Sequence, residues 1–355
     1  MDVISPFLWG AIISGLVASL IIIVLTPFSE RLRLMDIPDE RKRHGEPVPM
    51  IGGIAIFMAL LGVAQVYSMD LLWSWLLAGS TVLVVVGFLD DVFDLGVRIR
   101  LVAQMFACGL MIWGAQISVT GLGVMGGVSV DLGIAGLVLT FVASVGLINA
   151  FNMVDGIDGL AAGHALIALV SIVLGQWLTF GLQHQFGLAV LGSAIFAFWL
   201  VNMSLTPLRK VFLGDAGSLV LGFLIAWLLI ALSQGSSPSL HPVMTIWCVT
   251  LPVFDTIVVV ARRLRRGRSP FSADRQHLHH LLLAAGFSKR GALAIILIVA
   301  LVCNVSGLIV TAILGSIWSL VLWAFCLIAF MAIVFHPQVE AGALGRHRQS
   351  RISVD

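Results

Sequence analysis

About eleven apolar runs, each long enough to cross a lipid bilayer as a helix, divide this 355-residue chain. Polar loops separate the runs and hold nearly all of the charged residues. The sequence therefore predicts an all-α, polytopic integral membrane protein with about eleven transmembrane helices. The runs cover roughly residues 7–26, 50–68, 71–89, 101–118, 134–150, 159–178, 186–206, 217–234, 241–261, 290–313 and 316–335.

The composition excludes the main soluble classes. Hydrophobic residues make up 59% of the chain and charged residues 11%, and the mean hydropathy is +1.08. A typical soluble domain has about 25% charged residues, so this chain cannot cover a soluble core. The net charge of +2 gives no overall attraction to nucleic acid, and the four cysteines lie in apolar runs without paired spacing, which argues against a disulfide framework.

The basic residues are distributed on one side of the predicted bundle. All 20 lysines and arginines fall in the loops that follow the odd-numbered runs or in the tail, and the opposite loops hold none. The positive-inside rule makes that side cytoplasmic, which places the N-terminus outside and the C-terminus in the cytoplasm. Most acids lie on the same side, whereas a transporter is expected to carry polar groups deep in several spans. This pattern favours an enzyme that works at the cytoplasmic surface.

We expect one transmembrane catalytic domain over residues 1–335 and a cytoplasmic tail over 336–355, because no long polar domain interrupts the runs. The catalytic chemistry is expected in the cytoplasmic loops. These loops cover residues 27–49, 90–100, 150–158, 207–216 and 262–289.

The first candidate motif lies at the cytoplasmic end of the third run. Asp90, Asp91 and Asp94 stand within five residues, next to hydrocarbon. Adjacent carboxylates repel one another, so they need a metal ion, a basic side chain or a shared proton.

The second motif follows the fifth run. Asn152, Asp155 and Asp158 recur at every third position, and Gly156 and Gly159 let the chain turn or approach a ligand closely. Carboxylates and carboxamides are hard oxygen ligands that suit Mg²⁺. They also suit hydrogen bonds to a base or a sugar.

The third motif opens the eighth run, with Asp215 and Ser218 at a helix N-terminus. Two interpretations stay open for Asp215. It is an ordinary N-cap, or it binds a metal ion beside backbone N–H groups that favour anions.

The fourth motif is the last cytoplasmic loop. Positive-inside anchoring explains its basic start, residues 262–266, but not Arg275 or the histidines His277, His279 and His280. Arginine and histidine donors together suit a diphosphate, and a zinc site is the less favoured alternative because no cysteine is near.

Two further polar residues lie inside predicted spans. Asp255 is expected to face a cavity or a partner, and it either supports the site or fixes a neighbouring helix. His164 is interpreted as an interior group rather than a catalyst.

These blocks, in this order and on one face of the bundle, resemble those of the polyprenyl-phosphate N-acetylhexosamine-1-phosphate transferases. The similarity runs from about residue 30 to 290, and the loop Ser269–His280 looks most like the bacterial WecA branch. The blocks are Pro49–Gly53, Asp90-Asp91, Asn152-x-x-Asp155-Gly-x-Asp158-Gly-Leu, Gly214-Asp215-x-Gly217-Ser218 and the histidine loop.

The resemblance implies transfer of GlcNAc-1-phosphate from UDP-GlcNAc to undecaprenyl phosphate, with undecaprenyl-diphosphate-GlcNAc and UMP as products. It implies a Mg²⁺ cofactor, with Mn²⁺ as a substitute, and a role in O-antigen or other cell-envelope polysaccharide synthesis. The implied location is the bacterial inner membrane with a cytoplasmic active site. Whether the chain forms a homodimer stays open.

With that reaction in view, we expect Asp215 and Asn152 to bind Mg²⁺. Asp90 and Asp91 are then expected to handle the acceptor phosphate as the catalytic acids, one of them taking its proton. Direct displacement is favoured over a covalent intermediate, because a phosphate monoester is already a nucleophile.

The remaining motif residues are expected to bind the donor substrate. Asp155 and Asp158 hold uridine or support the metal. Four residues of the last loop hold the diphosphate or the sugar: Arg275, His277, His279 and His280.

Three alternatives remain at this stage. One is the same reaction with another UDP-N-acetylhexosamine. The second is an intramembrane prenyltransferase of the UbiA type, which also uses aspartate-rich motifs with Mg²⁺ but needs no Arg/His loop. The third is a transporter, which only Asp255 supports.

Overall fold

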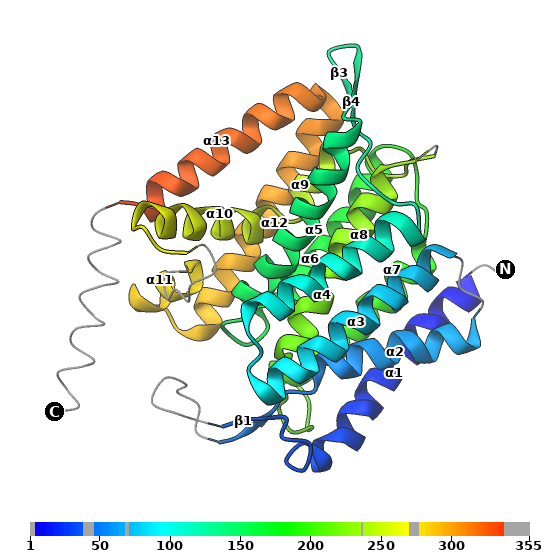
Figure 1. Ribbon diagram of the computed structural model, residues 1–355, viewed down its shortest axis with the longest axis vertical. Coiled ribbons are helices and arrows are strands. Elements are labelled where there is room, and N and C mark those ends of the chain that lie inside the picture. Colours follow the sequence, from blue (N-terminus) through cyan, green and yellow to red (C-terminus); the bar gives the residue numbers. More distant parts are fainter. Residues whose placement is uncertain (1–3, 38–45, 68–70, 236, 270–276, 337–355) are drawn as a thin grey trace.

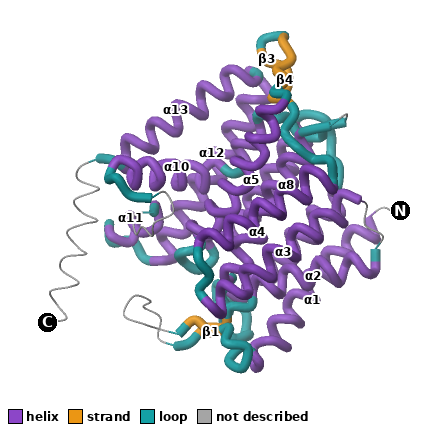
Figure 2. The backbone as a smooth tube through the Cα atoms, in the orientation of Figure 1, coloured by secondary structure: helices purple, strands orange, loops and turns teal. Residues whose placement is uncertain are grey.

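The computed structural model describes residues 4–37, 46–67, 71–235, 237–269 and 277–336. These parts are mainly helical, with two short antiparallel hairpins (Figures 1 and 2). The elements are α1 (Ile4–Leu25), η1 (Thr26–Phe28), β1 (Met35–Asp36), β2 (Val48–Pro49), α2 (Gly52–Val66), α3 (Leu71–Phe93), α4 (Val97–Gly109), η2 (Leu110–Gly114), β3 (Gly121–Met125), β4 (Val128–Asp131), α5 (Ile134–Val154), α6 (Leu160–Leu178), α7 (Gln185–Asn202), α8 (Gly214–Ser233), α9 (Met244–Cys248), α10 (Thr250–Arg265), α11 (Leu278–Ala284), α12 (Lys289–Leu314) and α13 (Ser316–Val334).

Every predicted apolar run coincides with helix in the structure. Within the described residues, nine helical segments are long and apolar enough to cross a membrane. Two predicted spans fall short of that standard. The second predicted span forms α2, which has only 15 residues. The ninth predicted span is interrupted between α9 and α10. The helical membrane architecture is therefore confirmed, while the number of spans and the sides of the termini stay predictions. The predicted tail, 336–355, lies outside the described residues except for His336.

Helix α8 forms the centre of the bundle. Its sequence is apolar on all sides after the first turn, and 94% of its most apolar 18-residue stretch is buried inside the protein. Helices α2, α3, α5 and α6 pack around it. By contrast, most of α13 and of the first apolar segment, Phe7–Phe28, is not buried inside the protein, as expected for helices at the lipid boundary.

Glycines allow α2 and α3 to reach the first turn of α8. A methyl group on Gly53 of α2 would collide with the backbone of Gly217, and one on Gly87 of α3 would collide with the backbone of Ala216. Small residues at such crossings allow helix backbones to approach closely. This is the structural reason for Gly53 at the end of the turn at residues 49–53.

A helix break separates α9 from α10, and a proline causes it. Pro252 has no N–H, so the carbonyl of Cys248, four residues earlier, loses its helical donor. The side-chain Nδ2 of Asn304, on α12, donates to that carbonyl over 3.0 Å instead. After the break, α10 runs across the bundle rather than along α9 (Figure 1).

The two hairpins lie at opposite ends of the bundle (Figures 1 and 2). β1 and β2 lie near the start of α8, since Met50 forms a bridge with Phe212. β3 and β4 protrude at the other end. The glycine-rich stretch 121–126 forms the first strand of this hairpin and the start of its turn.

The Gly53 contact gives a stability test. We expect Gly53→Ala to lower the free energy of unfolding by about 1–3 kcal/mol, because the added methyl group has no room against Gly217. Gly62→Ala, in the same helix, is the matched control, since its methyl group would meet only Val17 at 3.6 Å. Thermal melting in detergent should show a loss for the first variant alone, and equal melting temperatures would contradict the packing argument.

Candidate active site

The acidic motifs meet where three helix ends converge. Asp90 and Asp91 lie in the last turn of α3, Asn152 in the last turn of α5, and Asp215 in the first turn of α8. Because α3 and α5 both pack along α8, residues far apart in the sequence come together at one end of the bundle.

Asp91 caps α8 from a neighbouring helix. Its two carboxylate oxygens accept hydrogen bonds from the backbone N–H groups of Asp215, at 2.8 Å, and Ala216, at 3.2 Å. These N–H groups have no partner within the helix, and the positive end of the helix dipole favours a carboxylate there. Gly214 adopts a φ of +74°, and a methyl group on it would lie 2.7 Å from Asp91, so glycine is needed at this position. The N-cap interpretation of Asp215 is therefore wrong: Asp91 supplies the cap.

Asp90 is held by a base. Its carboxylate, whose side chain is 2% exposed, accepts from Arg100 Nη1 at 2.9 Å and from the backbone N–H of Leu95 at 2.7 Å. This buried acid therefore has both a base and a backbone N–H as partners. Arg100 is partly exposed and faces the cavity described below.

Asn152 and Asp215, the two predicted metal ligands, are in direct contact. Asn152 Nδ2 donates to Asp215 Oδ1 at 2.6 Å and to Ser218 Oγ at 2.9 Å. Their oxygen atoms are suitable ligands for a hard divalent ion. Within the described residues, however, no group of three or more His, Cys, Asp or Glu side chains is already arranged to hold a metal ion.

Asp155 is an acid without a compensating base. Within the described residues, its carboxylate accepts no hydrogen bond and forms no ion pair. The surrounding protein desolvates its carboxylate, and the charges of Asp215, Asp91 and Asp158 add to this effect, so its pKa rises to about 8. Negative charge at this point thus exceeds what nearby bases neutralise.

Asp158 pairs with a lysine that the sequence had assigned only to membrane orientation. Lys210 Nζ lies 2.6 Å from Asp158 Oδ2 and 5.0 Å from the ring centroid of Phe212. This pair links the loop after α5 to the segment before α8.

The histidine motif lies on the short helix α11. His277 Nδ1 lies 2.8 Å from Asp255 Oδ2, so Asp255 contacts the histidine motif directly, and both of its predicted roles, supporting the site and fixing a neighbouring helix, stay open. His279 is buried, with its Nε2 against Gly156 of the second motif. Burial, followed by the charges of His280 and His277, lowers the pKa of His279 to about 3, so this ring is neutral. Arg275 lies outside the described residues.

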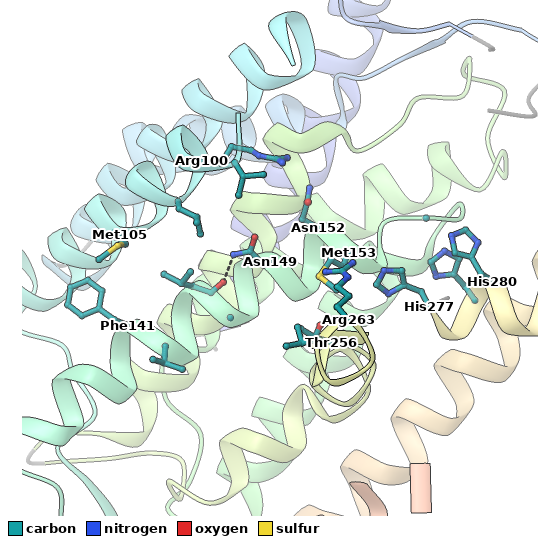
Figure 3. A pocket seen from close by; sticks show the side chains of 18 residues that line it. Arg100, Met105, Phe141, Asn149, Asn152, Met153, Thr256, Arg263, His277 and His280 are labelled. Atoms are coloured by element: carbon teal, nitrogen blue, oxygen red, sulfur yellow. Dashed lines mark hydrogen bonds between the residues drawn. The ribbon is translucent and has the colours of Figure 1, made fainter. Parts of the chain in front are cut away.

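A cavity of about 750 Å³ extends from this site between α4, α5, α10 and α11 (Figure 3). One end is apolar and is formed by Leu101, Met105, Phe141, Val142 and Val145. The other end is polar and includes Arg100, Asn149, Asn152, Arg263, His277 and His280. Such a cavity suits a ligand with an apolar chain and an anionic head.

Arg263 is a site residue that sequence reasoning missed. The sequence attributed residues 262–266 to positive-inside anchoring and did not predict that Arg263 is buried and lines the cavity. Helical spacing offered a signal, because Asp255 and Arg263 are eight residues apart and so share a helix face.

The fold and the site thus define a multi-pass membrane protein with an acidic cluster beside an amphiphilic cavity. Residues 73–233 match the family described as glycosyl transferase family 4. The chain belongs to this family.

Several curated relatives cover most of the chain, and each carries the name undecaprenyl-phosphate alpha-N-acetylglucosaminyl 1-phosphate transferase. The protein of Escherichia coli (strain K12) is 36% identical over 84% of this chain and 80% of its own length. That of Salmonella typhi is 38% identical over 79% and 77%, respectively. That of Haemophilus influenzae is 34% identical over 90% and 89%. The predicted family is therefore confirmed.

The raised pKa of Asp155 predicts a pH-dependent stability. An acid with a higher pKa in the folded state than in the unfolded state destabilises the fold as pH rises from about 4 towards 8. We expect Asp155→Asn to raise the melting temperature above pH 7 without added divalent ions, and to have little effect near pH 4. Melting curves in detergent across this range test the sign; a variant that is less stable at pH 8 would show that the carboxylate is compensated.

Proposed function

We propose that this chain transfers GlcNAc-1-phosphate from UDP-GlcNAc to undecaprenyl phosphate, with undecaprenyl-diphosphate-GlcNAc and UMP as products. The observation that carries the proposal is the continuity between the apolar end of the cavity and the polar end beside the acidic cluster. The names of the curated relatives support the same reaction. We place the site at the cytoplasmic face of the bacterial inner membrane, because the lysines and arginines lie on that side.

The cavity gives the acceptor lipid a binding mode. Its prenyl chain would lie along Met105, Phe141 and Val145, and its phosphate would reach Arg100 and Arg263 at the polar end. Arginines bind phosphate through paired N–H donors. Asp90 acts on the acceptor through Arg100, whose guanidinium it holds in place. The acceptor phosphate has a second pKa near ~6, so removing its last proton needs little help at neutral pH.

A divalent cation fits the opposite side of the site. Asp215, Asn152 and Asp155 would hold Mg²⁺ or Mn²⁺, since they offer oxygen ligands and a negative charge that no described base neutralises. When bound, the ion would offset the charge that builds up on the diphosphate during transfer. Asp91 keeps Asp215 in position by capping α8.

The donor is assigned to the face between α5, α11 and the loop before α8. Asp158 and Lys210 stand at one edge, and His277 and His280 at the other. Histidine donors suit the diphosphate, and the carboxylate suits hydroxyl or base N–H groups.

A radiolabelled assay with UDP-GlcNAc, UDP-GalNAc and UDP-MurNAc-pentapeptide, with and without undecaprenyl phosphate, tests the reaction and the sugar. Labelled lipid should appear with UDP-GlcNAc only when the acceptor is present.

The metal assignment gives a kinetic test. Asp215→Ala is expected to abolish transfer at every Mg²⁺ concentration, because a charged ligand is lost. Asn152→Ala is expected to raise the Mg²⁺ concentration needed for half-maximal rate, because a neutral ligand contributes less. Asp131→Asn, on the distant hairpin β4, is the control for the loss of a carboxylate. Normal rate and normal Mg²⁺ dependence for Asp215→Ala would contradict the assignment.

The topology can be tested by labelling in whole cells. In a variant with the four native cysteines replaced, a cysteine at exposed Ser129 of β4 should react with a membrane-impermeant maleimide from outside. A cysteine at exposed Ala285, just after α11, should react only after the membrane is opened. The reverse pattern would place the site on the outer face.

A further inference from the structure

Asp255 uses both carboxylate oxygens at the start of α11. Oδ2 lies 2.8 Å from His277 Nδ1, and Oδ1 accepts from the backbone N–H of Leu278 at 2.9 Å. The Asp255 and His277 side chains are 7% and 6% exposed, so water hardly competes for this contact. A buried carboxylate with such specific partners fixes where the histidine ring lies.

We propose that Asp255 is a positioning residue for transfer, acting through His277 on the anionic part of the donor. This inference rests on the proposed function and extends it to a residue that does not line the main cavity. His277 does line that cavity (Figure 3).

The chemistry follows from the two ring nitrogens. Because Nδ1 faces the carboxylate, Nε2 is the nitrogen left for a ligand. A carboxylate that faces Nδ1 fixes the orientation of the ring. The protonated ring offers an Nε2–H donor, which suits a phosphate oxygen. His279 also lines the cavity, but its ring is buried with Nε2 against Gly156, and no carboxylate among the described residues is seen to orient it as Asp255 orients His277.

The break before α10 places Asp255 next to the start of α11. Asp255 follows Pro252 by three residues, and the side chain of Asn304 occupies the backbone acceptor that Pro252 leaves free. The new direction of α10 carries Asp255 to α11 and Arg263, two turns later, into the cavity wall. One short helix thus supplies both an orienting acid and a cation.

A double-mutant cycle on the full-length chain in detergent tests the inference. The variants are Asp255→Asn, His277→Gln and the double variant, with Asp131→Asn on β4 as the matched carboxylate control. We expect Asp255→Asn to lower kcat/KM for UDP-GlcNAc by about 10–100-fold, as is typical for the loss of a carboxylate that orients a histidine. The KM for undecaprenyl phosphate should stay unchanged. The double variant should be no worse than His277→Gln alone, and the control should keep normal activity.

Two outcomes would overturn the inference. Losses that multiply in the double variant would show that Asp255 acts independently of His277. Loss of cooperative thermal melting in Asp255→Asn would show that the carboxylate holds the fold instead of orienting one side chain.

Failure of the proposed function is a separate result. If the wild-type chain transfers nothing from UDP-GlcNAc, the proposed function is wrong. The double-mutant cycle is then carried out on ligand binding, with inorganic pyrophosphate as the ligand. The rise in melting temperature on adding pyrophosphate should then be reduced equally in Asp255→Asn, His277→Gln and the double variant. An additive pattern, or no rise in the wild type, would overturn the role of Asp255.

Discussion

The first turn of α8 must be buried, and its backbone N–H groups therefore need acceptors inside the protein. Asp91 provides them from the end of α3, through bonds to the N–H groups of Asp215 and Ala216. Because Gly53 and Gly87 allow α2 and α3 to approach, this carboxylate reaches the helix end without distorting either backbone. The position of Asp215, in the capped turn, depends on this junction.

Charge is divided unevenly around the junction. Asp90 has Arg100, Asp158 has Lys210 and Asp255 has His277 as partners. Asp155 has no such base among the described residues, and its raised pKa reflects the surplus of negative charge. A cation-dependent site needs a surplus of negative charge, because a base paired with every carboxylate would exclude the metal ion. This distribution supports the assignment of Asp155 to the metal side of the site rather than to the structural scaffold.

The sequence predicted what depends on local pattern. Hydrophobic length located each helical segment, and the spacing of Asp90, Asn152 and Asp215 near helix ends correctly placed them on one face. It could not predict which acid meets which base, because those pairs join residues brought together only by packing. The sequence assigned Asp91 to the acceptor phosphate, a role that stays a prediction, and it gave no sign that this carboxylate caps α8. It also attributed Arg263 to positive-inside anchoring and did not predict that this side chain is buried.

Helix α10 shows why a break within a span is useful to an enzyme of this kind. A straight helix through residues 244–265 would keep α9 and α10 in line within the bundle. The break at Pro252, stabilised by Asn304, turns α10 across the bundle, where Arg263 forms part of the cavity wall. The same turn brings Asp255 to His277. In the proposed reaction the lipid phosphate and the donor diphosphate must meet within bonding distance. One helix that contributes to both proposed binding regions would fix their separation. The cost of an interrupted helix in an apolar environment is offset because a side-chain amide replaces the missing backbone donor.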